Sequence, residues 1–254
     1  MMTDLNTFDE LKTLDNVVGG GLIIAVDGPS GTGKSTVCRL LATAADAKYL
    51  DTGAMYRVAT LHVLRSGIDP SDEDAVAEAT ADLPLQVNED PASTEVLLDG
   101  EDVSAEIRGP EVTAHVSAVA AVPAVRANLV ALQRALALQT GRCVVEGRDI
   151  GTAVLPDAAC KVYMTASAQI RARRRYDQDT AAGRTVDFDA VLADVERRDA
   201  ADSSRTVSPL RPAEDATILD TGELDIDGVL DALAGLTVAS AANPADFTTA
   251  GSNR

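Results

Sequence analysis

The residues with the most specific chemistry form a glycine-rich segment near the N-terminus: Gly28, Pro29, Ser30, Gly31, Thr32, Gly33, Lys34, Ser35 and Thr36. Their spacing fits G-x-x-x-x-G-K-[ST], in which glycines let backbone N–H groups face phosphate oxygens. Lys34 would reach the β and γ phosphates of ATP, and the Ser35 hydroxyl would bind Mg²⁺. An apolar run at 22–26 precedes the segment and a helical pattern follows it, so a chance glycine-rich turn is disfavoured. We therefore predict an ATP-binding phosphate loop over 28–36.

This loop does not identify the acceptor of the phosphoryl group. A GTPase is disfavoured, because the chain has no Asn-Lys-x-Asp segment to bind guanine. The apolar run 143–146 ends in Glu146, where a Walker B strand usually ends in Asp, and Gly147, Arg148 and Asp149 follow it. These features favour a kinase with a small acceptor over a motor or a switch.

The elements that must position these residues alternate along the chain, which predicts a doubly wound parallel α/β sheet flanked by helices. Apolar runs predict five strands, at 22–26, 48–50, 143–146, 161–164 and 217–219. Helical spacing predicts a helix from Lys34 and others at 54–65, 71–81, 111–121, 123–139, 167–179 and 187–205. Asp99-Gly100 between short apolar runs predicts a small antiparallel β insertion over about 83–103. We expect 1–20 to be a flexible leader, 21–239 the folded domain and 240–254 a disordered tail.

Composition restricts the possible partners. The formal net charge of -18 disfavours a nucleic-acid or anionic-membrane partner, since phosphates attract Lys and Arg. Arg is nevertheless concentrated at 171–175 and 197–211, which indicates a local anionic ligand. Three cysteines, each beside apolar residues, indicate buried thiols in a reducing compartment. With no signal peptide and no apolar run of about 20 residues, we expect a cytoplasmic protein.

Together, several segments resemble the bacterial-type cytidylate kinase family, within the P-loop nucleoside monophosphate kinases. They follow the family's order over about 22–235 and read IAVDGPSGTGKST (24–36), LDTGAMYR (50–57), GEDVSAEIR (100–108), SAVAAVPAVR (117–126), EGRDIG (146–151), PDA (156–158) and RDAADSSRTVSPL (198–210). The resemblance implies a five-stranded parallel core, an acceptor-binding region enlarged by the β insertion, and a mobile helical lid over about 171–188. It also implies a monomer that transfers the γ-phosphoryl group of Mg²⁺-ATP to CMP and dCMP.

The resemblance assigns roles to single residues. The acceptor phosphate would lie near Arg57, Arg148 and Arg205. Cytosine would be read by Ser117, Arg126 and Asp149, whose donors and acceptor suit cytosine better than uracil. The ribose side would involve Arg198 and Asp202, and Arg198 could also lie near phosphate. The catalytic residues would be Lys34, Arg148 and three arginines of the lid, Arg171, Arg174 and Arg175. The lid arginines would stabilise the charge of the phosphoryl group during transfer. Thr52 stands where many relatives have Ser, which leaves the preference for CMP over dCMP open.

Residue chemistry alone leaves alternatives open. A single Arg is more often a solvated charge or a salt bridge, and Ser117 or Asp149 alone would more often be a surface hydroxyl or a turn residue. Arg198, Asp202 and Arg205 share a predicted helical face, which favours a polar site over an exposed ladder of ion pairs. UMP, AMP or shikimate could be the acceptor instead, and the chain could be a nucleotide-binding regulatory module without turnover.

Overall fold

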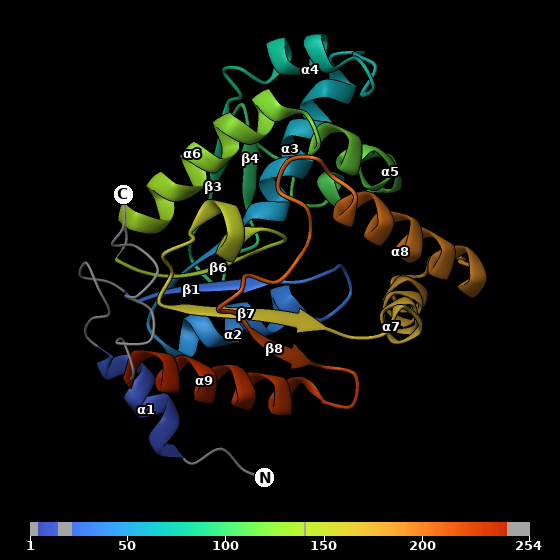
Figure 1. The fold of residues 1–254 in the computed structure, drawn as a ribbon. Coiled ribbons are helices and arrows are strands. Elements are labelled where there is room, and N and C mark those ends of the chain that lie inside the picture. The colour runs from blue at the N-terminus through green and yellow to red at the C-terminus, as the bar shows by residue number, and fades with distance from the viewer. Residues whose placement is uncertain (1–4, 15–21, 140, 243–254) are drawn as a thin grey trace.

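A parallel sheet of five strands forms the centre of the computed structural model, which describes residues 5–14, 22–139 and 141–242 (Figure 1). The strand order is β2-β6-β1-β7-β8. The strands are β1 (Leu22–Asp27), β2 (Lys48–Asp51), β6 (Arg142–Gly147), β7 (Cys160–Thr165) and β8 (Thr217–Asp220). The predicted doubly wound α/β fold is confirmed, and each of the five predicted strands lies within an observed one.

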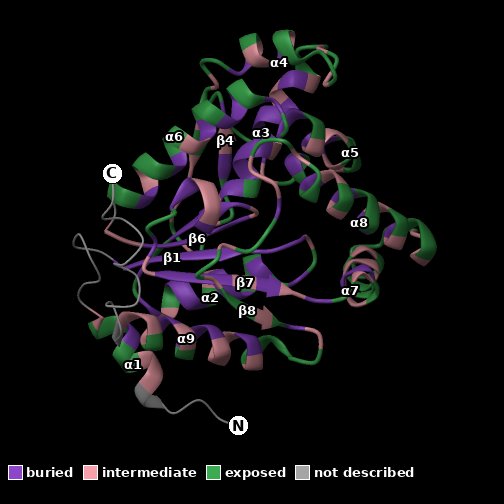
Figure 2. Ribbon diagram, viewed as in Figure 1, coloured by how far each residue is buried: buried purple, intermediate pink, exposed green. Residues whose placement is uncertain are grey.

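Helices cover both faces of this sheet, which explains why β1 is buried along its whole length (Figure 2). Side chains of β1 alternate between two cores: Ile23 and Ala25 pack with one, and Ile24 and Val26 with the other. The first core includes residues of α3 (Thr52–Arg65) and α6 (Pro123–Gln139). The second includes residues of α1 (Leu5–Thr13), α2 (Lys34–Ala44) and α9 (Ile226–Ala242). The two cores fix the strand ends relative to the helices that start there.

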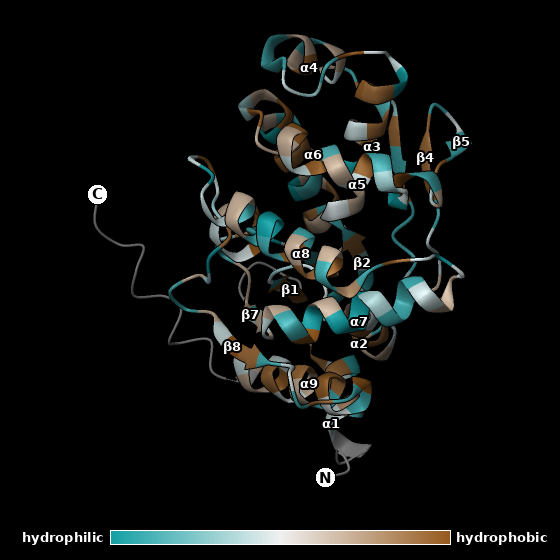
Figure 3. Cartoon of the chain, turned by 90° about the vertical axis from the view of Figure 1, so that its right-hand side faces the viewer, coloured by the Kyte–Doolittle hydropathy of each residue, from teal (hydrophilic) through white to brown (hydrophobic). Residues whose placement is uncertain are grey.

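The remaining elements form a small second sheet with its neighbouring helices and a pair of helices beside the central sheet. A three-stranded antiparallel sheet of β3 (Leu85–Val87), β4 (Val96–Leu98) and β5 (Glu101–Asp102) confirms the predicted β insertion. It packs near α3, beside α4 (Glu73–Ala79), a 3₁₀ turn (Glu106–Arg108) and α5 (Pro110–Val119). The predicted lid segment, about 171–188, lies within a pair of helices, α7 (Ala168–Ala181) and α8 (Phe188–Ser203), which pack together through Ala172, Val191 and Val195. In Figure 3 these two helices cross in front of the central sheet.

Three sequence expectations need correction. The leader is not flexible throughout, because Leu5–Thr13 forms α1, whose Leu11 is fully buried in the core with α2 and α9. Residues 1–4 and 15–20 lie outside the described ranges. The tail prediction began too early, since α9, which was not predicted, continues to Ala242; residues 243–254 are likewise not described. Helix α4 begins at Glu73 rather than Ser71, because the Asp72 carboxylate caps it by accepting the Ala75 N–H.

One other prediction agrees with the structure. Cys38, Cys143 and Cys160 are buried thiols. Within the described ranges no single helix is long and apolar enough to cross a membrane; α5 and α6 reach that composition only together, and they are bent by 98° at their junction.

Candidate active site

The phosphate loop joins β1 to α2 and has the backbone conformation that its glycines predict. Gly28, Gly31 and Gly33 have φ of 144°, 82° and 92°, values that side chains rarely allow. A Cβ on Gly28 would also lie 2.1 Å from the carbonyl oxygen of Met164, at the end of β7. The loop therefore packs directly on the sheet edge, with the N-terminus of α2 behind it as an anion-binding position.

Lys34 lies within this loop rather than on the surface. Its ammonium group donates to the carbonyl oxygens of Gly28 at 2.7 Å and Pro29 at 2.8 Å. Burial, followed by the charge of Arg148, lowers the pKa of Lys34 to about 7. A polyphosphate bound in the loop would favour the charged ammonium form, because an anion nearby raises the pKa of a base.

A buried carboxylate lies beside Ser35. The Ser35 hydroxyl donates to Glu146 Oε1 at 2.6 Å, and the Tyr49 hydroxyl donates to the same oxygen at 2.6 Å. The second oxygen, Glu146 Oε2, is buried without a hydrogen-bond partner in the described part of the chain. A hydroxyl next to an unpartnered carboxylate oxygen is an oxygen-only donor set, which fits Mg²⁺. Glu146 thus occupies the place of the Walker B carboxylate that the sequence analysis did not find.

The turn after β6 is held to β1 by Asp27. The Asp27 carboxylate accepts the backbone N–H groups of Ile150 at 2.7 Å and Gly151 at 2.8 Å. Burial raises the pKa of Asp27 to about 6, although these two hydrogen bonds act in the opposite direction. Because this turn carries Arg148 and Asp149, Asp27 fixes two predicted site residues relative to the phosphate loop.

Two of the three predicted acceptor-side arginines, Arg148 and Arg205, meet at Asp202, and the charge of Arg148 acts on Arg57. One Asp202 oxygen accepts Arg148 Nε at 3.1 Å and the other accepts Arg205. Arg57 donates to the Ile107 carbonyl at 2.9 Å and the Thr113 hydroxyl at 3.0 Å. More cations than anions therefore meet here.

Arg198 differs from its neighbours. Its side chain is 7% exposed as part of α8, yet it has no hydrogen bond or ion pair to any described residue, and its Nε is buried without a partner. Burial, then the charges of Arg148 and Arg57, lowers the pKa of Arg198 to about 10. The Asp202 carboxylate acts on Arg198 in the opposite direction, but it is already paired with Arg148 and Arg205, so the arrangement suits a further, bound anion.

The predicted base-reading residues fall into two places. Arg126 of α6 donates to Asp149 in a buried ion pair with side chains 4% and 5% exposed, and Arg126 Nε is buried without a described partner. Burial raises the pKa of Asp149. Ser117 lies on α5 and lines a cavity of about 630 Å³ that Arg205 also lines. Thr52 faces the sheet instead and donates to the Glu146 carbonyl at 2.7 Å.

The three lid arginines point to different partners. Arg171 is buried and donates to the Ser30 carbonyl of the phosphate loop at 3.1 Å and to both carboxylate oxygens of Asp199. Arg174 donates to the Thr221 carbonyl at 2.5 Å, and Arg175 pairs with Asp194 at 2.7 Å. Of the three, Arg175 acts electrostatically on both Arg57 and Arg198. In this structure Arg171 and Arg174 join α7 to the phosphate loop, and Arg175 lies toward Arg57 and Arg198.

Sequence reasoning missed Tyr49, Glu146 and Asp27. All three could have been suspected from their place at or near the carboxyl ends of neighbouring parallel strands, where ligands of open α/β sheets bind. The strand register agrees with this placement of Glu146. Strands β2 and β6 pair in parallel with Asp51, the last residue of β2, opposite Glu146.

The comparisons with known proteins agree with this geometry. The family model described as cytidylate kinase matches residues 24–238. The chain is 70% identical to the cytidylate kinase of Corynebacterium glutamicum over 222 residues, 87% of this chain and 96% of the relative. It is 65% identical to that of Rhodococcus opacus over 209 residues, 82% of this chain and 91% of the relative. The family model and these relatives identify the chain as a member of the cytidylate kinase family and as a nucleoside monophosphate kinase.

Proposed function

We propose that this kinase transfers the γ-phosphoryl group of ATP to CMP and dCMP, giving CDP or dCDP and ADP. The observation that carries the proposal is Arg198, a buried cation without a described partner, close enough to Arg57 and Arg148 for their charges to lower its pKa. A nucleoside monophosphate brings a phosphate dianion, which would satisfy several forked cations at once. The acceptor phosphate would then face the loop that holds ATP.

Mg²⁺ fits the pair of Ser35 and Glu146, which would hold it directly or through its bound water. Bound there, the ion would neutralise charge on the β and γ phosphates. The residues of the chain supply the remaining steps. Lys34 would move from the Gly28 and Pro29 carbonyls to phosphate oxygens, as the loop N–H groups orient the same group.

Positioning and charge stabilisation supply the catalysis in this proposal. The acceptor oxygen is already anionic, so no general base is required. Arg148, at the end of β6, would face both the acceptor and the transferring phosphoryl group, and Arg175 would approach from the lid. Arg171 and Arg174 would set the lid on the phosphate loop, and closure would exclude water.

Base selection is proposed to lie with Asp149, Arg126 and Ser117. The exocyclic amine of cytosine would donate to the Asp149 carboxylate, and its ring acceptors would take hydrogen bonds from Arg126 and Ser117. Uracil presents a carbonyl where cytosine has the amine, so two acceptors would face each other. Arg205 would join Arg57 and Arg148 at the acceptor phosphate, and Asp202 would complete the ribose side of the site.

The decisive experiment measures ADP release with CMP, dCMP, UMP, AMP and shikimate as acceptors. Fastest turnover with CMP or dCMP is expected, and fastest turnover with UMP or AMP would contradict the cytosine assignment. Nucleotide binding without turnover on any acceptor would favour a regulatory module. We further propose that the protein is a cytoplasmic monomer, and sedimentation equilibrium would test the monomeric state. We also propose that it has no nucleic-acid or membrane partner, and the net charge of -18 supports this.

A further inference from the structure

A buried tyrosine outside the predicted site touches the carboxylate proposed to hold the metal. Tyr49 lies in β2 beside β6, and it is 1% exposed. Its hydroxyl donates to Glu146 Oε1 at 2.6 Å, the oxygen that also accepts the Ser35 hydroxyl at 2.6 Å. Both donors therefore occupy one oxygen, and Glu146 Oε2 is left buried without a partner among the described residues.

We propose that Tyr49 is a positioning residue, which fixes the Glu146 carboxylate so that Oε2 faces Mg²⁺. The inference rests on the proposed metal site at Ser35 and Glu146. A glutamate side chain has three rotatable bonds, and rotation of this carboxylate would break two short hydrogen bonds at once. Hydrogen bonds to a ligating carboxylate commonly set its orientation and strengthen metal binding.

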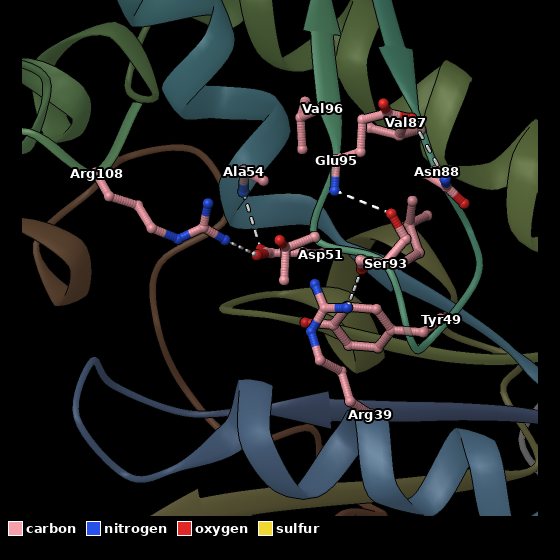
Figure 4. A pocket seen from close by; sticks show the side chains of 12 residues that line it. Arg39, Tyr49, Asp51, Ala54, Val87, Asn88, Ser93, Glu95, Val96 and Arg108 are labelled. Atoms are coloured by element: carbon pink, nitrogen blue, oxygen red, sulfur yellow. Dashed lines mark hydrogen bonds and ion pairs between the residues drawn. The ribbon is translucent and has the colours of Figure 1, made fainter. Parts of the chain in front are cut away.

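Tyr49 is itself held by the acceptor-side β insertion. The Arg39 guanidinium lies 4.3 Å above the Tyr49 ring and donates to the Ser93 carbonyl oxygen (Figure 4). It also donates to the Pro91 carbonyl oxygen at 3.0 Å. The Tyr49 N–H donates to the Glu89 carbonyl at 2.9 Å. These carbonyls belong to the loop between β3 and β4, so contacts run from the β insertion through Tyr49 to Glu146.

The experiment compares nucleotide affinity with and without metal, in the absence of turnover. Calorimetry measures the Kd of adenylyl imidodiphosphate, a non-hydrolysable ATP analogue, in excess Mg²⁺ and in EDTA. The ratio of the two affinities is the gain from metal. Tyr49→Phe keeps the ring beneath Arg39 and removes only the hydroxyl, so this gain should fall about 10-fold. If both affinities fall equally, Tyr49 has a merely structural role and the proposal is overturned.

A double-mutant cycle tests whether Tyr49 acts through Glu146. Glu146→Gln should remove most of the gain from metal, and adding Tyr49→Phe should then change little. Independent, additive losses would contradict the proposal. Tyr176→Phe is the matched control, because it removes a phenol hydroxyl from a ring that packs on Phe188 in the lid; the gain should stay at the wild-type value.

The outcomes separate the two proposals. A wild-type protein without any gain from metal would refute the metal site and the role of Tyr49 together. A gain that Glu146→Gln removes and Tyr49→Phe leaves intact would refute only the role of Tyr49.

Discussion

Arg198→Met should stabilise the CMP-free protein and weaken CMP binding. Holding the Arg198 charge in place is unfavourable, because burial and neighbouring arginines lower its pKa from 12.5 to about 10. At about 1.36 kcal/mol for each pKa unit, this corresponds to about 3 kcal/mol. Asp202 keeps two partners in the variant, Arg148 and Arg205, and methionine retains much of the apolar stem. We expect the free energy of unfolding to rise by about 1–3 kcal/mol, in the range found when buried charges are replaced by apolar groups.

The loss in binding should be of similar size. Removing a buried cation that faces an anion costs about 2–5 kcal/mol, so the Kd for CMP should rise roughly 100-fold. Urea unfolding followed by circular dichroism measures stability, and calorimetry measures CMP affinity. Arg197→Met is the control for stability: Arg197 is 53% exposed in an ion pair with Asp194, and this change should alter the unfolding free energy by less than about 0.5 kcal/mol. An Arg198→Met variant that is clearly less stable than wild type, or that binds CMP normally, would refute the reasoning.

Further predictions concern the loop, the base site and the lid. Lys34→Met should lower kcat at least 100-fold with the fold retained, and near-normal kcat would contradict its role. Because the pKa of Lys34 is lowered to about 7, the unfolded chain binds more protons than the folded one between pH 7 and 10. The free energy of unfolding of the wild type should therefore rise with pH over this range, and Lys34→Met should lack that rise. Asp149→Asn should reduce the ratio of kcat/KM for CMP to that for UMP about 10-fold or more, and an unchanged ratio would remove Asp149 from base reading. Arg171→Met should lower stability by about 2 kcal/mol in urea unfolding, whereas Arg175→Met should mainly lower kcat; the reverse pattern would contradict the lid geometry.

Local patterns predicted the features that local physics controls. The phosphate loop was predictable because positive φ angles demand glycine at 28, 31 and 33 and the flanking strand and helix are continuous in sequence. The five strands were predictable for a similar reason, since buried parallel strands are short apolar runs. Helix α1 was missed because its Leu11 is stabilised by packing with the distant helix α9, which leaves no trace in the leader itself.

Pairing between distant charges was beyond sequence reasoning. The spacing of Arg171, Arg174 and Arg175 correctly predicted a helix, yet their partners come from other segments. Arg171 pairs with Asp199, which follows Arg198 directly in sequence, and Arg198 itself has no described partner. Only the packing of α7 on α8 decides which arginine is neutralised. The contact of Tyr49 with Glu146 likewise depends on two strands 97 residues apart in sequence.

Helix α1 has a practical consequence for shortened versions of this enzyme. The family match begins at residue 24, so a protein engineer would be inclined to start a minimal chain just before β1. Arg142, at the start of β6, donates to the carbonyl oxygens of Leu11 and Leu14 as well as to that of Ala45. Such a truncation would delete two of these acceptors and expose the apolar cluster in which Leu11 packs. Shortened chains made for expression should therefore keep residues from about Leu5 onward, and affinity tags should be placed ahead of them.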